Sequence, residues 1–182
     1  MSKIVSFVGG VQGPWKVVRI ENVVGKPLEP VEKLQIVDGS IENPSFNTNW
    51  ILRGVTSNLR YTTSQEKEHL NKHSPPLGRK EATCAALIPI KKSVEWWELA
   101  QDERREILEE QSQHIKKGLR YLPAIARRLH HSRDLGEPFD FITWFEYSPD
   151  YSRDFEELVS SLRTTLEWKY VEREVDIRLA LD

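Results

Sequence analysis

Arg127 occupies a position where the surrounding residues predict an apolar side chain. In the strand-like segment Leu122–His131, alternation places Ile125, Arg127 and Leu129 on one face. A guanidinium on an inward-facing position must close an ion pair or serve a ligand that arrives there. Arg127 is therefore a candidate for binding an anion, and a structural ion pair or an arginine at a sheet edge is the alternative.

The next segment, Phe139–Tyr147, alternates in the same way. Its pattern places Phe141, Thr143 and Phe145 on one face, opposite Asp140 and Glu146. Gly and Pro residues between the two segments mark a bend, so we expect two consecutive strands.

His114 is the candidate for holding a ligand. It lies in a predicted helix, Asp102–Leu119, on the border of the apolar stripe. Glu110, one helical turn earlier, is the only nearby carboxylate at a suitable spacing, which argues poorly for zinc. A single imidazole suits haem better, because the porphyrin supplies the other four ligands; a structural or surface histidine is the alternative. The remaining histidines, which we expect at the surface, are His69, His73, His130 and His131.

The composition describes an ordinary globular protein. The chain has 182 residues, of which 38% are hydrophobic and 30% charged, with a net charge of −2. This charge gives no general attraction for nucleic acid or an anionic membrane, so we expect neither as a partner. One cysteine, Cys84, excludes an internal disulfide framework and any CxxC motif. No apolar segment reaches the length of a membrane span or signal-peptide core, and we expect a cytoplasmic protein.

Two unequal parts follow one another along the chain, and we assign them as domains 1–80 and 81–182. The first is rich in strands, with one short polar helix around residues 65–71, and it ends in the breaker-rich segment His73–Gly78. The strands that the first part predicts are Ile4–Val8, Trp15–Ile20, Lys33–Val37 and Asn49–Val55.

The second part predicts the order β-α-β-β-α-β of a ferredoxin-like unit. Its predicted elements are the strand Thr83–Ile90, a helix over Val94–Ala100 and Asp102–Leu119, the strands Ala124–His131 and Phe139–Tyr147, the helix Ser152–Leu166 and the strand Tyr170–Leu181. The first part resembles a truncated version of the same plan. We therefore expect an α+β fold in which both halves contribute to one antiparallel sheet, as in the dimeric α/β barrel-like superfamily.

The two faces of this sheet should differ. Alternation in the last strand turns its apolar residues inward and places Glu174, Asp176 and Arg178 outward, which suggests contact with water. Helices should cover one face of the sheet. The other face then needs a partner or a ligand.

Several separate motifs of residues 82–181 closely resemble chlorite dismutases, and in particular their short, dimeric lineage with a truncated N-terminal half. The resemblance implies haem b (iron protoporphyrin IX) beneath the C-terminal sheet, and a homodimer. The segments that carry the resemblance are Leu87–Trp97, the helix bearing His114, Tyr121–Arg127, Phe139–Tyr147 and Leu166–Glu174.

The resemblance also implies roles for individual residues. His114 matches the proximal ligand of the haem iron, and Glu167 matches the carboxylate that accepts a hydrogen bond from the other ring nitrogen of that histidine. Lys92 matches a lysine linked to this proximal network. Arg127 matches the arginine on the distal side of the haem, which accounts for its unusual position.

Further residues complete the implied site. The position corresponding to a glutamine that approaches the distal arginine in many relatives is Ser74, whose shorter side chain would hold Arg127 less firmly. Residues implied to contact the haem are Trp96 and Trp97, with Asn58 and Tyr61 at its propionates, and those implied to line a small distal cavity are Leu122, Thr143, Phe145 and Leu158.

The implied reaction is decomposition of chlorite to chloride and dioxygen, with formation of the O–O bond. Arg127 would attract and retain chlorite and its anionic fragments, since its guanidinium is permanently charged. Another small anion or peroxide could use the same pocket. The alternatives are a coproporphyrin-haem decarboxylase or peroxidase of the same superfamily, a non-catalytic haem-binding protein, and an interaction module without a cofactor. Arg127 argues against a decarboxylase, because those enzymes usually lack the distal arginine.

Overall fold

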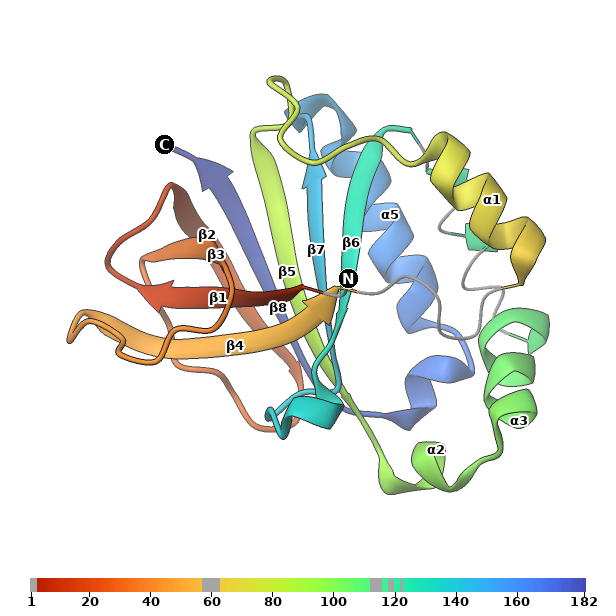
Figure 1. Cartoon of the computed structure of the whole chain (residues 1–182). Helices are drawn as coiled ribbons and strands as arrows, with labels where there is room; N and C mark the ends of the chain where they lie inside the picture. The colour runs from red at the N-terminus through yellow and green to blue at the C-terminus, as the bar shows by residue number, and fades with distance from the viewer. Residues whose placement is uncertain (1–2, 57–62, 112–115, 118–119, 122) are drawn as a thin grey trace.

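The computed structural model describes residues 3–56, 63–111, 116–117, 120–121 and 123–182. Eight antiparallel strands form a closed barrel in the order β1-β3-β2-β8-β5-β7-β6-β4. Helices gather on one side of β5, β7 and β6, and strands β1 to β4 lie on the other (Figure 1). The fold is therefore mixed α+β with antiparallel strands, as the sequence predicted.

The first half supplies four of the strands. They are β1 (Ile4–Gly10), β2 (Trp15–Val24), β3 (Lys33–Asp38) and β4 (Thr48–Thr56), followed by the helix α1 (Ser64–His73). All five elements lie where the sequence predicted them, although β1, β2 and β3 run beyond their predicted last residues and β4 and α1 extend at both ends. Gly9 in β1 allows a close approach, because a Cβ atom there would lie 2.5 Å from the ring of Trp50 on β4.

The second half supplies the other four strands and the remaining helices. Its elements are β5 (Cys84–Lys92), α2 (Val94–Glu98), α3 (Gln101–Arg105), β6 (Ile125–His131), β7 (Phe141–Tyr147), α5 (Ser152–Arg163) and β8 (Val171–Leu181). The predicted helix Asp102–Leu119 is not uniform: α3 continues as a π-helical turn over Glu106–Gln111. A short 3-10 turn, Glu167–Tyr170, connects α5 with β8.

Closure of the sheet is the main difference from the sequence-based expectation of one face waiting for a partner or ligand. β2 joins β8 along most of its length, whereas β4 meets β6 through only two residue pairs, Val55 with His131 and Thr56 with His130. Closure turns one face of β5, β7 and β6 into the barrel interior, so strands of the first half cover it. Sequence patterns did not reveal this, because alternation fixes the faces of a strand and not the neighbour across a seam.

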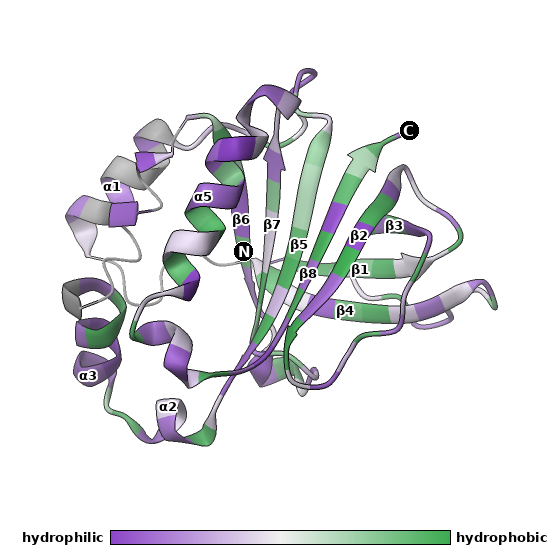
Figure 2. Cartoon of the chain, turned by 180° about the vertical axis from the view of Figure 1, so that it is seen from behind, coloured by the Kyte–Doolittle hydropathy of each residue, from purple (hydrophilic) through white to green (hydrophobic). Residues whose placement is uncertain are grey.

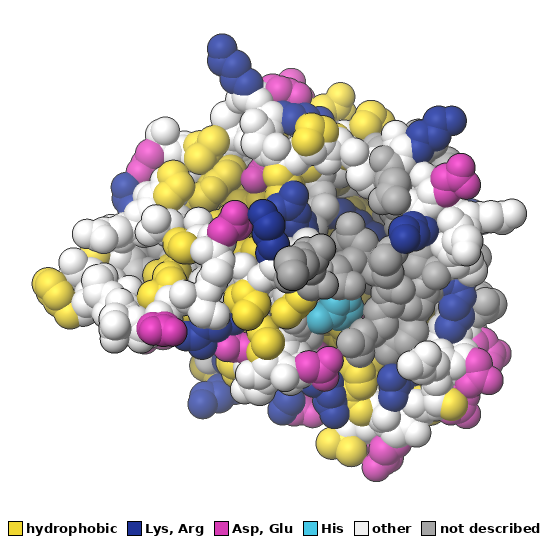
Figure 3. Space-filling model, in the orientation of Figure 1, with side chains coloured by type: hydrophobic (Ala, Val, Ile, Leu, Met, Phe, Trp, Pro, Cys, Tyr) yellow, Lys and Arg dark blue, Asp and Glu magenta, His cyan; other side chains and the backbone are white. Residues whose placement is uncertain are grey.

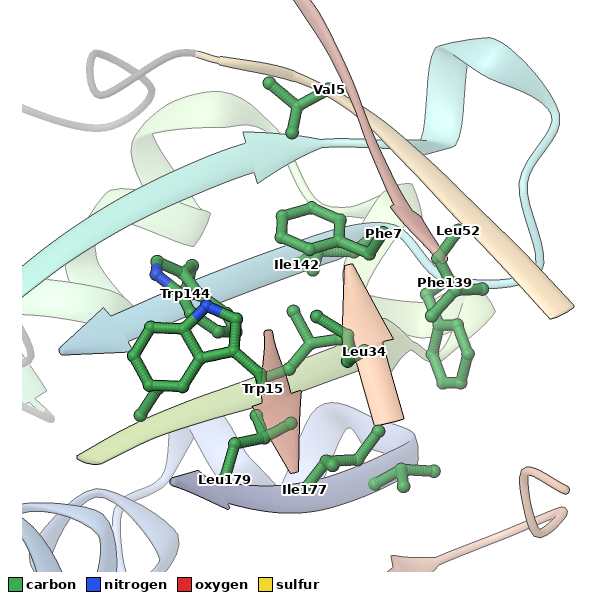
Figure 4. Packing of buried hydrophobic residues seen from close by; sticks show 13 residues of the cluster. Val5, Phe7, Trp15, Leu34, Leu52, Phe139, Ile142, Trp144, Ile177 and Leu179 are labelled. Carbon is green, nitrogen blue, oxygen red and sulfur yellow. The ribbon is translucent and has the colours of Figure 1, made fainter. Parts of the chain in front are cut away.

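The barrel interior is filled by a hydrophobic core (Figure 4). Trp144 of β7 lies near its centre, with the ring of Trp15 5.2 Å away edge-on and the ring of Phe7 6.2 Å away. The other buried members of this core are Val5, Leu34, Leu52, Ala85, Leu87, Phe139, Ile142, Val175, Ile177 and Leu179.

His130 is also buried in the barrel, although the sequence suggested a surface position. Only 2% of it is exposed, its ring lies edge-on to Phe7 at 5.1 Å, and its Nδ1 lies 3.2 Å from the carbonyl oxygen of Ile142. Burial lowers the pKa of His130 to about 4, so the ring is neutral at physiological pH. The alternation that placed Arg127 on one face of β6 had placed His130 on the other, and that face turns out to be the interior.

α5 packs on the opposite face of the sheet. Phe155, Leu158 and Val159 are its buried residues, and apolar and hydrophilic stretches alternate along it in Figure 2. They pack with apolar residues of β5, β6 and β7, among them Ile88, Ile125 and Phe145. The amphipathic pattern of residues 152–166 had predicted this packing.

The charged face of β8 lies beneath α5 and not in water. Glu174 and Asp176 have no exposed surface and Arg178 is 8% exposed, which overturns the expectation that these residues face solvent. Arg163 of α5 donates hydrogen bonds to both Glu174 and Asp176, at 2.7 to 2.9 Å. Charged side chains can share a buried face when each charge finds an opposite one.

No helix among the described residues is long and apolar enough to cross a membrane.

Candidate active site

A cavity of about 70 Å³ lies between the helix-covered face of the sheet and α5. It is several times larger than the roughly 10–15 Å³ that one water molecule requires. Most of its lining is apolar, so a charged group inside it loses hydration. The described lining residues are Ile88, Ile90, Tyr121, Ile125, Arg127, Thr143, Phe145, Leu158, Val159, Leu162, Trp168 and Glu174.

Arg127 is the cation of this cavity. Its strand β6 pairs with β7 so that Arg127 stands directly opposite Phe145, with Leu129 opposite Thr143. Among the described residues, no carboxylate forms an ion pair with Arg127 and no acceptor forms a hydrogen bond with it. Burial lowers the pKa of the guanidinium from its ordinary value, although arginine remains protonated. Such a charge attracts an anion strongly, because little else in the wall compensates it.

The segment after α1 is fixed close to the start of β6. The buried carboxylate of Glu146 accepts a hydrogen bond from the backbone N–H of Gly78 at 2.6 Å and one from the indole of Trp144 at 2.9 Å. Arg79 donates to the carbonyl oxygens of Pro123 and Ala124 at 3.2 and 3.0 Å. Ser74 is exposed and forms no hydrogen bond with Arg127 among the described contacts.

At one end of the helix-covered face, Lys92 and Glu167 form a buried ion pair. Their side chains are 4% and 5% exposed, and the Nζ of Lys92 lies 2.8 Å from Oε1 of Glu167. Lys92 ends β5, and its backbone N–H donates to Asp140 at 2.7 Å, while Glu167 opens the 3-10 turn after α5. Two elements far apart in sequence therefore hold one carboxylate in a fixed position.

Trp96 and Trp97 follow β5 and differ in their contacts, since only Trp96 packs against the ion pair. Trp96 is 1% exposed; the ammonium of Lys92 lies 4.3 Å from its ring, and Tyr170 lies 5.5 Å away. Trp97 donates its indole N–H to Asp140 at 3.2 Å. The guanidinium groups of Arg133 and Arg104 lie over its ring, 4.0 and 5.0 Å from the ring centre. Neither tryptophan belongs to the described lining of the cavity.

The structure thus brings together part of the site that the sequence analysis assembled. Arg127, Thr143, Phe145 and Leu158 line one cavity, and Lys92 pairs with Glu167. The assignments of His114, Asn58, Tyr61 and Leu122 lie outside the described residues.

Three further polar or aromatic residues of the cavity were missed. Tyr121 lines it, and burial, followed by the charge of Glu157, raises the pKa of its hydroxyl. Trp168 lines it from the 3-10 turn and donates its indole N–H to Glu174 at 2.8 Å. Alternation does place Glu174 on the face shared with the cavity, but its charge made that face look exposed.

Basic and apolar side chains of described residues lie close together near the centre of the molecular face in Figure 3. The cavity contains one cation without a described partner, Arg127, and one carboxylate, Glu174, whose charge Arg163 neutralises at 2.7 Å. Its net electrostatic character is therefore positive. This arrangement can retain a small anion and can shield reactive fragments from water.

Comparison with known proteins identifies the family. The family model described as chlorite dismutase matches residues 32–181, which is most of the chain. The chain belongs to the chlorite dismutase family. A curated chlorite dismutase from Ideonella dechloratans is 35% identical over 126 residues, covering 65% of this chain. That match spans 40% of the length of the Ideonella protein.

Solved structures agree with this assignment. A dimeric chlorite dismutase from Nitrobacter winogradskyi is 53% identical, with a TM-score of 0.90 over 98% of this chain and 99% of the other. A chlorite dismutase mutant from Candidatus Nitrospira defluvii, in complex with cyanide, has a TM-score of 0.73. It is 19% identical, and the match covers 99% of this chain and 90% of that one, so it supports the fold alone.

Proposed function

We propose that this protein is a haem b enzyme that decomposes chlorite to chloride and dioxygen. The observation that carries the proposal is the guanidinium of Arg127, which has no ion-pair partner among the described residues and lies in a mostly apolar cavity. A charge without a partner in a partly buried, apolar position is costly, and it is tolerated where a ligand of opposite charge binds it. Membership of the chlorite dismutase family supports chlorite as that anion.

Haem b fits the residues that surround this cavity. Aliphatic and aromatic side chains line most of it, as a porphyrin requires, and they come from β5, β6, β7 and α5. Glu167, fixed by Lys92, offers a buried carboxylate of the kind that orients a metal-binding imidazole. His114 is the proposed iron ligand. The proposed haem contacts are Lys92, Trp96, Trp97, Tyr61, Asn58, Leu122, Thr143, Phe145 and Leu158.

When bound, the haem would supply the iron at which the O–Cl bond of chlorite is cleaved and the O–O bond is made. The protein residues have separate tasks around it. Arg127 attracts chlorite and retains the hypochlorite-level fragment until the oxygen atoms join. Phe145 and Leu158 would keep water away from that fragment. Glu167 would accept a hydrogen bond from the ring N–H of His114 that does not face the iron, and would raise the basicity of the imidazole. The overall conversion of ClO₂⁻ to Cl⁻ and O₂ needs no further reactant.

We also propose that two copies form a homodimer and that each copy consists of two related ferredoxin-like parts, 1–80 and 81–182. The dimeric state of the Nitrobacter structure supports the first statement. The spatial order β8-β5-β7-β6 supports the second statement for residues 81–182. It places β5 and β8, the first and last strands of a β-α-β-β-α-β unit, beside one another.

Arg127→Ala tests the proposed trap. The haem-loaded parent should release oxygen from chlorite. The variant should fold and bind haem normally, yet release less oxygen per haem before the haem bleaches. Its hypochlorite-level fragment should escape more often, so a chlorination-sensitive scavenger in the buffer should be consumed faster.

Arg128→Ala is the matched control. Arg128 is the next residue of β6, carries the same charge, and is exposed away from the cavity. Its replacement should leave oxygen yield, lifetime and scavenger consumption at the parent values. Equal behaviour of the Arg127 and Arg128 variants would show that Arg127 is not the trap, whereas absence of oxygen release by the haem-loaded parent would refute the proposed reaction itself.

A further inference from the structure

A chain of charged side chains begins at the wall of the cavity and runs beneath α5. Its first member is Glu174, which lines the cavity and has no exposed surface. Arg163 binds both Glu174 and Asp176. Arg178 binds Asp176 through two nitrogen atoms, at 2.5 and 3.0 Å, and it also pairs with Glu156 on α5. The proposed reaction uses none of these residues.

Glu174 divides its two oxygen atoms between two partners. Oε1 accepts from Nε and Nη2 of Arg163, at 2.9 and 2.7 Å, and Oε2 accepts from the indole N–H of Trp168 at 2.8 Å. The carboxylate is thereby fixed by a charge-assisted interaction on one side and directs a second hydrogen bond on the other. Asp176 has the same burial and also binds Arg163, but it makes no described contact with Trp168.

Trp168 belongs to the four-residue turn Glu167–Tyr170, which has little structure of its own. Inside and next to this turn, the N–H of Trp168 bonds to Thr165 at 3.2 Å and that of Lys169 bonds to Leu166 at 3.1 Å. Other elements hold its ends: Lys92 binds Glu167, and the N–H of Ser93 binds the carbonyl of Tyr170 at 2.7 Å.

We propose that Glu174 is a positioning residue for the proximal side of the site. By holding Trp168 through its indole N–H, Glu174 fixes the turn and hence the direction in which Glu167, the preceding residue, presents its carboxylate. The role of Glu167 toward an iron-bound imidazole rests on the proposed function. The positioning of the turn itself does not, so the two can be tested separately.

The first test uses the protein without haem. Hydrogen exchange of the backbone amides of Trp168 and Lys169 should accelerate about tenfold in Glu174→Gln. Arg163 and Trp168 bind different oxygen atoms of Glu174, and glutamine keeps only one acceptor oxygen. Asp176→Asn removes a buried carboxylate from the same network and should leave these two amides at the parent rate. Equal acceleration in both variants, or in neither, would overturn the positioning role.

The second test uses the haem-loaded protein and reads the reduction potential of the iron. Trp168→Phe keeps every charge and removes only the indole donor, so a rise in potential would report a weaker hold on Glu167. Glu174→Gln should raise the potential as well, and the double variant should add little to the larger of the two shifts. If Glu174→Gln raises it but Trp168→Phe does not, Glu174 acts through its charge and the positioning role is wrong.

The two proposals fail in different ways. A parent protein that binds no haem contradicts the proposed function, yet the exchange rates of the apoprotein still decide whether Glu174 fixes the turn. A parent that binds haem and releases oxygen, with Trp168 and Lys169 amides unaffected by Glu174→Gln, contradicts only the positioning role.

Discussion

Arg127 and Arg178 lie on the same helix-covered face of one sheet but in opposite electrostatic surroundings. Arg178 binds Asp176 through two nitrogen atoms, at 2.5 and 3.0 Å, and also pairs with Glu156. Burial opposes its charge, but these carboxylates raise its pKa above the ordinary value. Burial lowers the pKa of Arg127, and no described carboxylate offsets it.

Under the proposed function, the difference between these two arginines separates a structural charge from a ligand-binding one. An internal ion pair completes Arg178 within the folded chain, so its contribution is to stability. Arg127 has no such partner among the described residues, so under the proposed function it carries a cost in the empty protein and stabilises the complex with its anion. Residue type and burial alone do not distinguish the two arginines. The presence or absence of a carboxylate partner among the described residues does.

Arg178→Met should have the largest effect on stability. It leaves Asp176 buried with only Arg163 as a cationic partner, and breaking a buried ion pair typically costs roughly 3–5 kcal/mol. Urea denaturation of the parent and variant measures this loss. Arg128→Met, an exposed change on β6, should stay within about 0.5 kcal/mol of the parent. A loss no larger than that of Arg128→Met would show that the pairing around Arg178 is not what holds β8 to α5.

His130 is a buried basic residue of a third kind, because its side chain is neutral in the folded protein at physiological pH. Its pKa is about 4 in the folded protein and about 6.5 in the unfolded chain, so the unfolded state binds the proton first as the pH falls. The free energy of unfolding should therefore drop by about 3 kcal/mol between pH 8 and pH 4 from this group alone.

The measurement compares unfolding curves of the parent and His130→Asn across that pH range. The difference between the two proteins should shrink by about 3 kcal/mol toward pH 4, because asparagine does not titrate there. A constant difference at every pH would mean that the imidazole has the same pKa in the folded and unfolded states, and hence that it is not buried in solution.

Arg127→Met should have the smallest effect on stability, and of the opposite sign to that of Arg178→Met. An apolar side chain of similar length removes an uncompensated charge, so the haem-free protein should gain up to about 1 kcal/mol. Urea denaturation of the apoprotein tests this gain. A loss of several kcal/mol would place Arg127 in the same structural class as Arg178 and remove the basis for the anion trap.

Strand alternation predicted the faces of the site well. It grouped Arg127 with Ile125 on one strand and Thr143 with Phe145 on the next, and all four line the cavity. Only the resemblance to a family joined the two groups in one cavity. The resemblance to a family linked Lys92 to the proximal network in general terms, and the ion pair with Glu167 itself came from the structure, because no local pattern links residues 75 positions apart in sequence.

Patterns of polarity failed where the fold buries charge. Glu174 and Asp176 looked solvent-exposed because alternating charges usually mark a wet strand face, and their partner Arg163 comes from a helix whose docking the sequence does not specify. His130 was misplaced for a related reason: closure of the barrel covers its face with the first half of the chain, and that contact depends on only a few residue pairs.

Closure of the barrel also affects how this chain meets others. In the part of the chain that the structure describes, each of the eight strands has a hydrogen-bonded neighbour on both sides. An open strand edge is a template on which further chains can add, and it is a common route to aggregation. Here such edges are restricted to the seams with few pairs, β2 with β3 and β4 with β6. The proposed homodimer is therefore expected to form mainly through side chains, because unpaired strand length is confined to these two seams.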